Sequence, residues 1–228
     1  TAQKKQTQFI ASASHELRTP LAVVRSGLES VEKCSNEEER NHFLHLMSEE
    51  TVHMKRLIDD MLLLANSDAD TLTIKPEACQ PDLLLLDTYE KFEPLARKNG
   101  LHLILTLPEE ILPDCFCDIH RTEQIFSIIV DNALCYTPSG GKVTLSCHAE
   151  NEMLCFLFKD TGCGISEEKK SHIFERFYRA DDAHTDREHF GLGLCIAKEL
   201  TEKQNGNIQV VDAPISGSCF MVQLPCAL

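Results

Sequence analysis

The chain has 228 residues, which is large for one domain and comfortable for two small ones. Apolar residues make up 43% of it, enough for hydrophobic cores, while Asp and Glu (36) outnumber Lys and Arg (22) to give a formal net charge of −14. Because a nucleic-acid footprint is normally basic, this charge argues against direct nucleic-acid binding.

The first part of the chain has the spacing of two helices. Apolar residues recur at intervals of three and four, which places them on one stripe of each helix. The two series are Phe9, Ala13, Leu17, Leu21, Val24, Leu28 and Val31, then Phe43, Met47, Met54, Leu57, Ile58, Met61, Leu62 and Ala65. Between them, residues 35–39 predict a turn, with Ser35 or Asn36 capping the second helix. A lone helical hairpin leaves much of each stripe in water, so we expect two copies to form a dimeric four-helix bundle.

From about Thr71 the pattern becomes mixed. Alternating stretches predict strands and longer periodic stretches predict helices, which together indicate an α+β sandwich with helices on one face of a sheet. The expected strands are 71–74, 101–105, 142–147, 153–159, 209–211 and 219–224, and the expected helices are 81–99, 119–135 and 192–205. We therefore expect a first domain over residues 1–68 and a second over 71–228.

Residues Ser14–Pro20 form the first motif with chemistry in it. A lone His-Glu pair on a helix is ordinarily a surface feature. Here, however, His15 lies outside the apolar stripe, and Pro20 costs the helix about 3 kcal/mol by removing a hydrogen bond. In this setting Glu16 can orient the imidazole and accept its proton while a ring nitrogen attacks phosphorus.

A second motif, Asp131–Pro138, closes the helix expected over 119–135. Alone it reads as a helix C-terminus, but the side-chain oxygen of Asn132 is also of the type that Mg²⁺ prefers. A third motif, Asp160–Ile165, follows a strand. Its glycines fit neither a Rossmann fingerprint nor a P-loop. Instead, Asp160 can accept a hydrogen bond from an adenine amino group while the glycines let the backbone approach the ring.

The fourth motif runs from Ile173 to Arg179, continues through the polar stretch 180–188 and ends at Gly191–Leu194. Its aromatic residues belong in part to a core. The polar stretch has no apolar periodicity, and it leads to glycines at a helix start, where phosphate charge is favoured. The whole motif therefore predicts a lid over phosphates.

Together these motifs resemble the sensor histidine kinases of two-component systems, in order and in spacing. Residues Ser14–Pro20 resemble the phosphoacceptor box of the HisKA dimerisation domain, and the other motifs resemble the boxes of a GHKL-type (Bergerat) ATPase domain. The resemblance implies that His15 is phosphorylated from ATP, that Glu16 is the acid/base, and that Thr19 positions water when a partner is dephosphorylated. It implies Asn132 as the Mg²⁺ ligand and Asp160 as the adenine anchor. The nucleotide-binding residues it implies are Asn132, Tyr136, Asp160, Gly162, Gly164, Ile165, Phe174, Phe177, Arg179, Gly191, Leu192, Gly193 and Leu194.

The same resemblance implies a homodimer that passes phosphate to an Asp of a response-regulator receiver domain and that also acts as a regulator phosphatase. No run approaches the roughly 20 apolar residues of a membrane helix. We therefore expect the chain to be the cytoplasmic part of an inner-membrane-anchored bacterial sensor, with membrane contact only through an upstream sensor region.

Some positions depart from the family pattern. Ile128 stands where a second Asn is usual, Cys135 where Lys or Arg is common, and His189-Phe190 where the second glycine box has Gly-Thr. Each change removes a phosphate contact or backbone freedom, so we expect weak or slow autokinase activity, unless Arg176, Arg179 or Arg187 compensates. Two rival readings remain: a degenerate kinase acting as a dimeric scaffold or regulator phosphatase, and a GHKL ATPase of the chaperone or topoisomerase kind.

The eleven cysteines are scattered, and several lie in apolar runs, where a free thiol behaves as a small hydrophobe. Cys115 and Cys117 are the closest pair, and no second pair completes a zinc-type framework. The sequence therefore predicts reduced thiols and no metal site among them.

Overall fold

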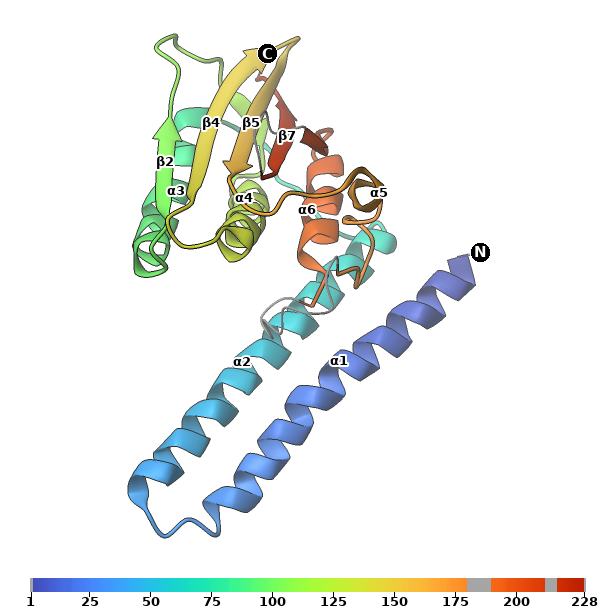
Figure 1. Ribbon diagram of the computed structural model, residues 1–228. Helices are drawn as coiled ribbons and strands as arrows, with labels where there is room; N and C mark the ends of the chain where they lie inside the picture. The colour runs from blue at the N-terminus through green and yellow to red at the C-terminus, as the bar shows by residue number, and fades with distance from the viewer. Residues whose placement is uncertain (1, 180–189, 212–216, 228) are drawn as a thin grey trace. The chain divides into compact units, whose positions relative to one another are not determined.

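The computed structural model describes residues 2–179, 190–211 and 217–227 (Figure 1). The chain divides into two compact units. One, mainly helical, comprises residues 1–71 and 175–192, and the other, an α/β unit, comprises residues 72–174 and 193–228. None of the helices in the described ranges combines the length and the apolar character needed to cross a bilayer.

The helical unit is an antiparallel hairpin of α1 (Ala2–Val31) and α2 (Glu37–Asp68), as the apolar spacing predicted. Asn36 caps α2 by accepting a hydrogen bond from the Glu38 N–H at 2.9 Å, and three glutamates in the first turn suit the helix dipole. The two helices approach closely at Gly27, where an added Cβ would lie 2.7 Å from the Met47 Cγ. A small residue is therefore required on α1 at this level of the hairpin.

A five-stranded sheet organises the α/β unit. Its strand order is β2-β4-β5-β7-β6, with β2 parallel to β4 and the other pairs antiparallel. The strands are β2 (His102–Thr106), β4 (Lys142–Glu150), β5 (Met153–Asp160), β6 (Asn207–Val211) and β7 (Cys219–Pro225). The helices α3 (Pro81–Lys98), α4 (Ile119–Tyr136) and α6 (Gly193–Glu202) pack against it, and α5 (Glu167–Lys170) is a single turn.

The core lies between the sheet and these helices. Alternate residues of β4, such as Val143 and Leu145, are fully buried, whereas their neighbours are partly exposed. The ring of Phe126 on α4 lies 4.8 Å from that of Phe156 and 5.0 Å from that of Phe158, both on β5. This alternation buries one face of the sheet and confirms the predicted α+β arrangement with helices on one side.

A second, two-stranded ribbon was not predicted. It pairs β1 (Glu77–Cys79) with β3 (Cys115–Cys117) in antiparallel register. The strand expected over residues 71–74 was wrong. Thr71 directs its backbone N–H (2.9 Å) and its hydroxyl (3.2 Å) to the Asn66 carbonyl at the end of α2, so these donors terminate a helix instead of joining a sheet.

Candidate active site

His15 lies on the exposed surface of α1. Thr19, one turn further along the same face, is also exposed, whereas Glu16 is half-buried and Pro20 is buried. The helix continues through Pro20, whose missing N–H cannot bond to the Glu16 carbonyl. The imidazole is thus presented to solvent on a regular helix, with a carboxylate at the adjacent position.

Asn132 lies near the end of α4 and is half-buried. Its amide nitrogen donates to the Ile128 carbonyl at 3.0 Å, and this bond fixes the orientation of the amide. The arrangement directs Oδ1, and not the NH₂ group, toward an outside partner. An amide oxygen of this kind fits Mg²⁺, which takes few protein ligands and fills its other positions with phosphate oxygens and water.

Asp160, at the end of β5, is only 3% exposed. Its Oδ1 accepts the backbone N–H groups of Gly162 at 2.8 Å and of Ser218 at 3.1 Å. Burial raises the pKa of this carboxyl, and hydrogen bonds from the backbone of Gly162 and from the backbone and side chain of Ser218 oppose the rise. With Oδ1 engaged by the loop, Oδ2 is the oxygen that can accept a hydrogen bond from a ligand.

The loop after Asp160 packs against the end of α4. A Cβ on Gly162 would lie 2.3 Å from the Tyr136 carbonyl oxygen. Gly164 has a left-handed φ of +75°, and a Cβ there would lie 3.1 Å from the Gly217 carbonyl oxygen. Glycine at 162 therefore lets the loop close onto α4, the helix that bears Asn132, and glycine at 164 lets it approach the backbone of Gly217. Tyr136, which is 42% exposed, borders the loop at Gly162.

The N-terminus of α6 lies beside the same helix. Gly193 begins α6, and a Cβ there would lie 3.1 Å from the Ile128 Cγ2. Ile128, one turn before Asn132, therefore faces the first residue of α6. Leu194, the next residue of α6, is half-buried, as is Ile165 after the glycine turn. A helix N-terminus next to an amide oxygen of the type that Mg²⁺ prefers suits the phosphates of a nucleotide.

Phe174 belongs to the α/β unit. Its ring lies 6.5 Å from that of Phe220, with the Lys198 ammonium 5.9 Å from the Phe174 centroid. Phe174 therefore packs against an aromatic residue of β7, in agreement with the prediction that the aromatic residues of this motif belong in part to a core.

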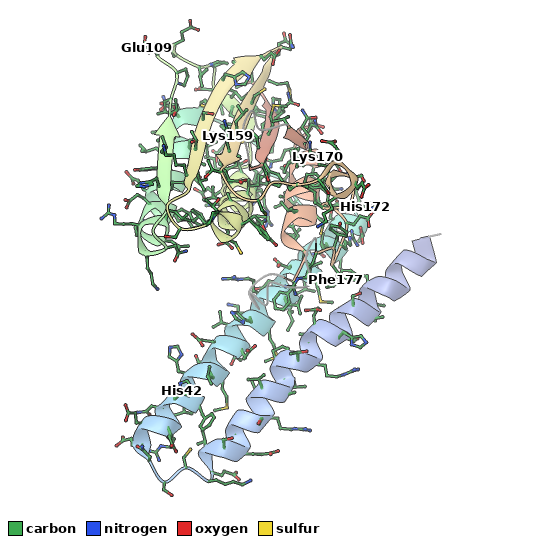
Figure 2. The ribbon with its side chains drawn as sticks, viewed as in Figure 1. His42, Glu109, Lys159, Lys170, His172 and Phe177 are labelled. Carbon is green, nitrogen blue, oxygen red and sulfur yellow. The ribbon has the colours of Figure 1, made fainter. Side chains whose placement is uncertain are left out.

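Other predicted nucleotide-binding residues belong to the helical unit: Phe177, Arg179, Gly191 and Leu192. The Phe177 ring (labelled in Figure 2) has its centroid 5.6 Å from that of Phe9, a residue of α1. The Phe177 N–H donates to the Gly191 carbonyl at 2.9 Å. Arg176 makes a bidentate pair with Asp68 at 2.7 and 2.8 Å. The structure thus groups these residues with the hairpin and not with Asn132 and Asp160. The stretch 180–188, with Arg187, and His189 lie outside the described residues.

Two residues that hold Asp160 were missed by the sequence reasoning. Ser218 donates its N–H to the carboxylate, and its carbonyl accepts the Asp160 N–H at 2.9 Å. Gly217 precedes it with a φ of +88°, and a Cβ there would lie 2.1 Å from the Asp160 carbonyl oxygen. The signal was a Ser-Gly-Ser sequence directly before the strand expected over 219–224.

Comparison with known families matches both parts of the chain. Residues 5–70 match the family described as His Kinase A (phospho-acceptor) domain. Residues 117–228 match the family described as histidine kinase-, DNA gyrase B- and HSP90-like ATPase. The chain belongs to the histidine kinases. It is a histidine kinase core of the two-component type, because it joins the phosphoacceptor domain to the ATPase domain in one chain.

Relatives and solved structures agree. The core is 34% identical over 226 residues to sensor histidine kinase RppB of Synechocystis sp., covering 97% of the chain and 49% of RppB, so it spans about half of that protein. Full-length ShkA in complex with AMPPNP superposes with a TM-score of 0.74 at 27% identity, covering 97% of the chain and 46% of ShkA. Histidine kinase ThkA, solved in complex with response regulator TrrA, has the same fold, with a TM-score of 0.77 at 19% identity over 96% of the chain and 61% of ThkA.

Proposed function

We propose that this kinase core phosphorylates itself on His15 from ATP and then transfers the phosphoryl group to an Asp of a response regulator. The exposed imidazole of His15, within the segment that matches a phospho-acceptor family, is the observation that carries the proposal. Residues 1–68 would form the dimerisation and phosphotransfer domain, and residues 71–228 the ATP-binding domain.

ATP would bind around Asp160, whose Oδ2 accepts the adenine amino group. Gly162, Gly164, Ile165 and Tyr136 would border the base, and Gly193 and Leu194 would meet the phosphates at the start of α6. The ShkA complex with AMPPNP supports nucleotide binding by this fold. Phe174, Phe177, Arg179, Gly191 and Leu192 complete the proposed nucleotide-binding set.

Asn132 would hold Mg²⁺ through Oδ1, and the ion would supply charge neutralisation at the phosphates. In the transfer step the His15 nitrogen forms a bond to the γ-phosphorus as the bond to the ADP oxygen breaks. Glu16 accepts the proton that His15 loses. In a separate phosphatase reaction, Thr19 would orient a water that hydrolyses the phosphoryl–Asp bond of the regulator and releases inorganic phosphate.

We also propose two protein partners for the kinase core, a second copy of itself and a receiver domain. The hairpin carries a hollow of ≈ 570 Å³ lined by Thr19, Gly27, Phe43 and Met47 among others. It also exposes large apolar side chains, including Leu21 (59%), Leu28 (55%) and Leu62 (57%). A second copy of the hairpin would cover such a surface as a homodimer. The ThkA–TrrA complex supports a receiver domain as the second partner. We place the core in the cytoplasm as part of a membrane-anchored bacterial sensor.

The test is incubation with ATP labelled at the γ-phosphate, followed by assay of acid-labile, alkali-stable label. Wild type should become labelled and His15→Gln should not. His42→Gln is the matched control, because His42 is an exposed histidine on the other helix of the same hairpin (Figure 2). Label that persists in His15→Gln would refute the proposal.

A slow or degenerate kinase is the second candidate. The observation that favours it is Ile128 on α4, whose apolar side chain faces Gly193 at the start of α6 and stands where the family usually has a second Asn. A titration with an ATP analogue and Mg²⁺ decides between the two. Ordinary micromolar affinity supports the active kinase, whereas binding of a receiver domain without nucleotide binding supports the scaffold.

A further inference from the structure

Three thiols gather on one face of the β1–β3 ribbon, away from the residues assigned to ATP. Cys115 and Cys117 are two residues apart on β3, so their side chains point to the same face. Cys79 on β1 is the register partner of Cys115 and therefore shares that face. The antiparallel pairing thus brings together cysteines that are 36 and 38 positions apart in the chain.

Their sulfur atoms are close enough to share one ion. All of the Sγ atoms lie within 4.8 Å of one another, and those of Cys79 and Cys117 are 3.4 Å apart. Zinc–sulfur bonds of about 2.3 Å place neighbouring thiolates about 3.8–4.0 Å apart in tetrahedral or trigonal geometry. The observed spacing brackets this value, so rotamer adjustments of a few tenths of an ångström suffice.

The surroundings favour a soft ion. Among the described residues the ligand group contains cysteines alone, without a carboxylate or an imidazole. Asp118, the carboxylate next to Cys117 in the sequence, is engaged elsewhere, because Oδ1 caps α4 through the Arg121 N–H and Oδ2 accepts the Lys75 N–H. An all-sulfur donor set selects zinc-group and other thiophilic ions over Mg²⁺ and Ca²⁺.

The site is held firmly and has an entry path. Cys115 and Cys117 are fully buried, whereas Cys79 is half-buried. On its other edge β3 is bridged by Cys226, and the Ala227 N–H donates to the Asp114 carbonyl at 2.7 Å. Strand β3 is therefore paired along both of its edges, and an ion reaches the thiols past Cys79, where water can fill a fourth position.

We propose that Cys79, Cys115 and Cys117 form a three-thiolate site for a soft divalent ion of the zinc group. On binding, three sulfur–metal bonds form and each thiol releases its proton to solvent, with no change of oxidation state. The site is separate from the proposed ATP site, so it stands or falls independently of the kinase activity.

The test is titration of the reduced, metal-free chain with Cd²⁺, followed by the thiolate-to-metal charge-transfer absorption. One Cd²⁺ should bind per chain, Zn²⁺ should displace it, and excess Mg²⁺ should not. Cys79→Ser and Cys117→Ser should each lower affinity by more than the roughly 10–100-fold that loss of a ligand's supporting hydrogen bond costs. Cys34→Ser, which alters a half-buried thiol just after α1, is the matched control and should bind like wild type.

Unchanged Cd²⁺ affinity in Cys79→Ser would overturn the proposal. Cys79 is chosen because it is the least buried of the three, and circular dichroism establishes whether each variant folds. If Cys117→Ser fails to fold, the Cys79→Ser result decides alone. A Cys79–Cys117 disulfide that forms on purification, with no metal uptake after reduction, would also overturn it.

Discussion

The carboxylate of Asp160 has two tasks, and substitutions can separate them. Its Oδ1 anchors the backbone N–H groups of Gly162 and Ser218, while its Oδ2 is assigned to adenine. Asp160→Ala removes both. Asp160→Asn keeps an oxygen at the Oδ1 position and replaces the other oxygen with an NH₂ donor. We expect the alanine variant to lose stability and nucleotide binding, and the asparagine variant to lose nucleotide binding alone.

The magnitude follows from the two bonds. Hydrogen bonds to a charged group contribute about 1.5–3 kcal/mol each, so loss of both costs roughly 3–6 kcal/mol. Burial of the carboxylate, which raises its pKa, offsets part of this loss. A net destabilisation of about 2–4 kcal/mol remains for Asp160→Ala, which lowers Tm by roughly 5–15 °C in a domain of this size.

Asp160→Asn should cost under about 1 kcal/mol, because the backbone donors keep their acceptor. Its affinity for ATP should still fall at least about 100-fold, since two donors would face each other at the adenine amino group. Thermal melting without nucleotide and calorimetric titration with an ATP analogue measure the two effects.

Hydrogen exchange at the Gly162 and Ser218 amides is the direct check. Both amides should be protected in wild type and in Asp160→Asn, and should exchange fast in Asp160→Ala. Equal Tm for Asp160→Ala and wild type, or equal protection of these amides in all three proteins, would refute the account of Asp160 as an anchor.

Three further predictions concern other sites. Ile128→Asn should raise affinity for Mg²⁺–ATP about 2–10-fold by adding a polar contact near the start of α6, and a calorimetric titration that shows no gain would contradict this. Burial raises the pKa of the Asp60 carboxyl to about 6. The folded state therefore holds this proton more tightly than the unfolded chain, and stability falls as pH rises from about 4 through about 6. Asp60→Asn should remove this pH dependence. Allowing for the partial exposure of the side chain, it should raise the free energy of unfolding by about 1–2 kcal/mol at pH 7.5 and negligibly at pH 4. Thermal melting at the two pH values measures the difference. Gly217→Ala should cost about 2–4 kcal/mol, because it combines a left-handed φ with a Cβ 2.1 Å from the Asp160 carbonyl. Gly140→Ala, with φ +83° and nothing within 4 Å, should cost only about 1 kcal/mol, and equal Tm losses for the two variants would show that the close approach is unimportant.

The elements that the sequence predicted well are those whose periodicity extends over many residues. Helices α1 and α2 repeat their apolar spacing for about six turns each, from Phe9 to Val31 and from Phe43 to Ala65, so one irregular position does not hide the pattern. Ser35 and Asn36 were both predicted as possible caps because acidic residues follow them, and the structure shows Asn36 as the cap. Strand β5 and its glycine turn were likewise visible, since Asp160 and Gly162 come directly after a buried strand.

The elements that could not be predicted from the sequence are short or depend on residues distant in the chain. β1 and β3 have three residues each, too few for alternation to stand out, and only their pairing makes them strands. Thr71 and Ile74 have high β propensity, yet tertiary context overrides it through the bonds from Thr71 to Asn66. The contact of Phe177 with Phe9 joins residues 168 positions apart and has no local signature.

The same limit explains the cysteines. Cys115 and Cys117 lacked a second pair nearby in the sequence, and the missing partner, Cys79, comes from β1 through a register that no local pattern encodes. Sequence patterns for metal sites rely on ligands that come in close pairs. Here the proposed third ligand, Cys79, stands alone on the neighbouring strand β1.

Helix α4 runs without interruption from the end of β3, next to the cysteine cluster, to the segment that carries Asn132. It starts two residues after Cys117, where the Gln204 Oε1 accepts the Asp118 N–H at 2.7 Å, and it ends at Tyr136, beyond Asn132. Eighteen residues at 1.5 Å each make it about 27 Å long, so a tilt of roughly 5° at its first turn moves its last turn by about 2 Å. That displacement is comparable to a metal–oxygen bond length. The position of Asn132 therefore depends on how firmly the first turn of α4, at the opposite end of the helix, is held in place.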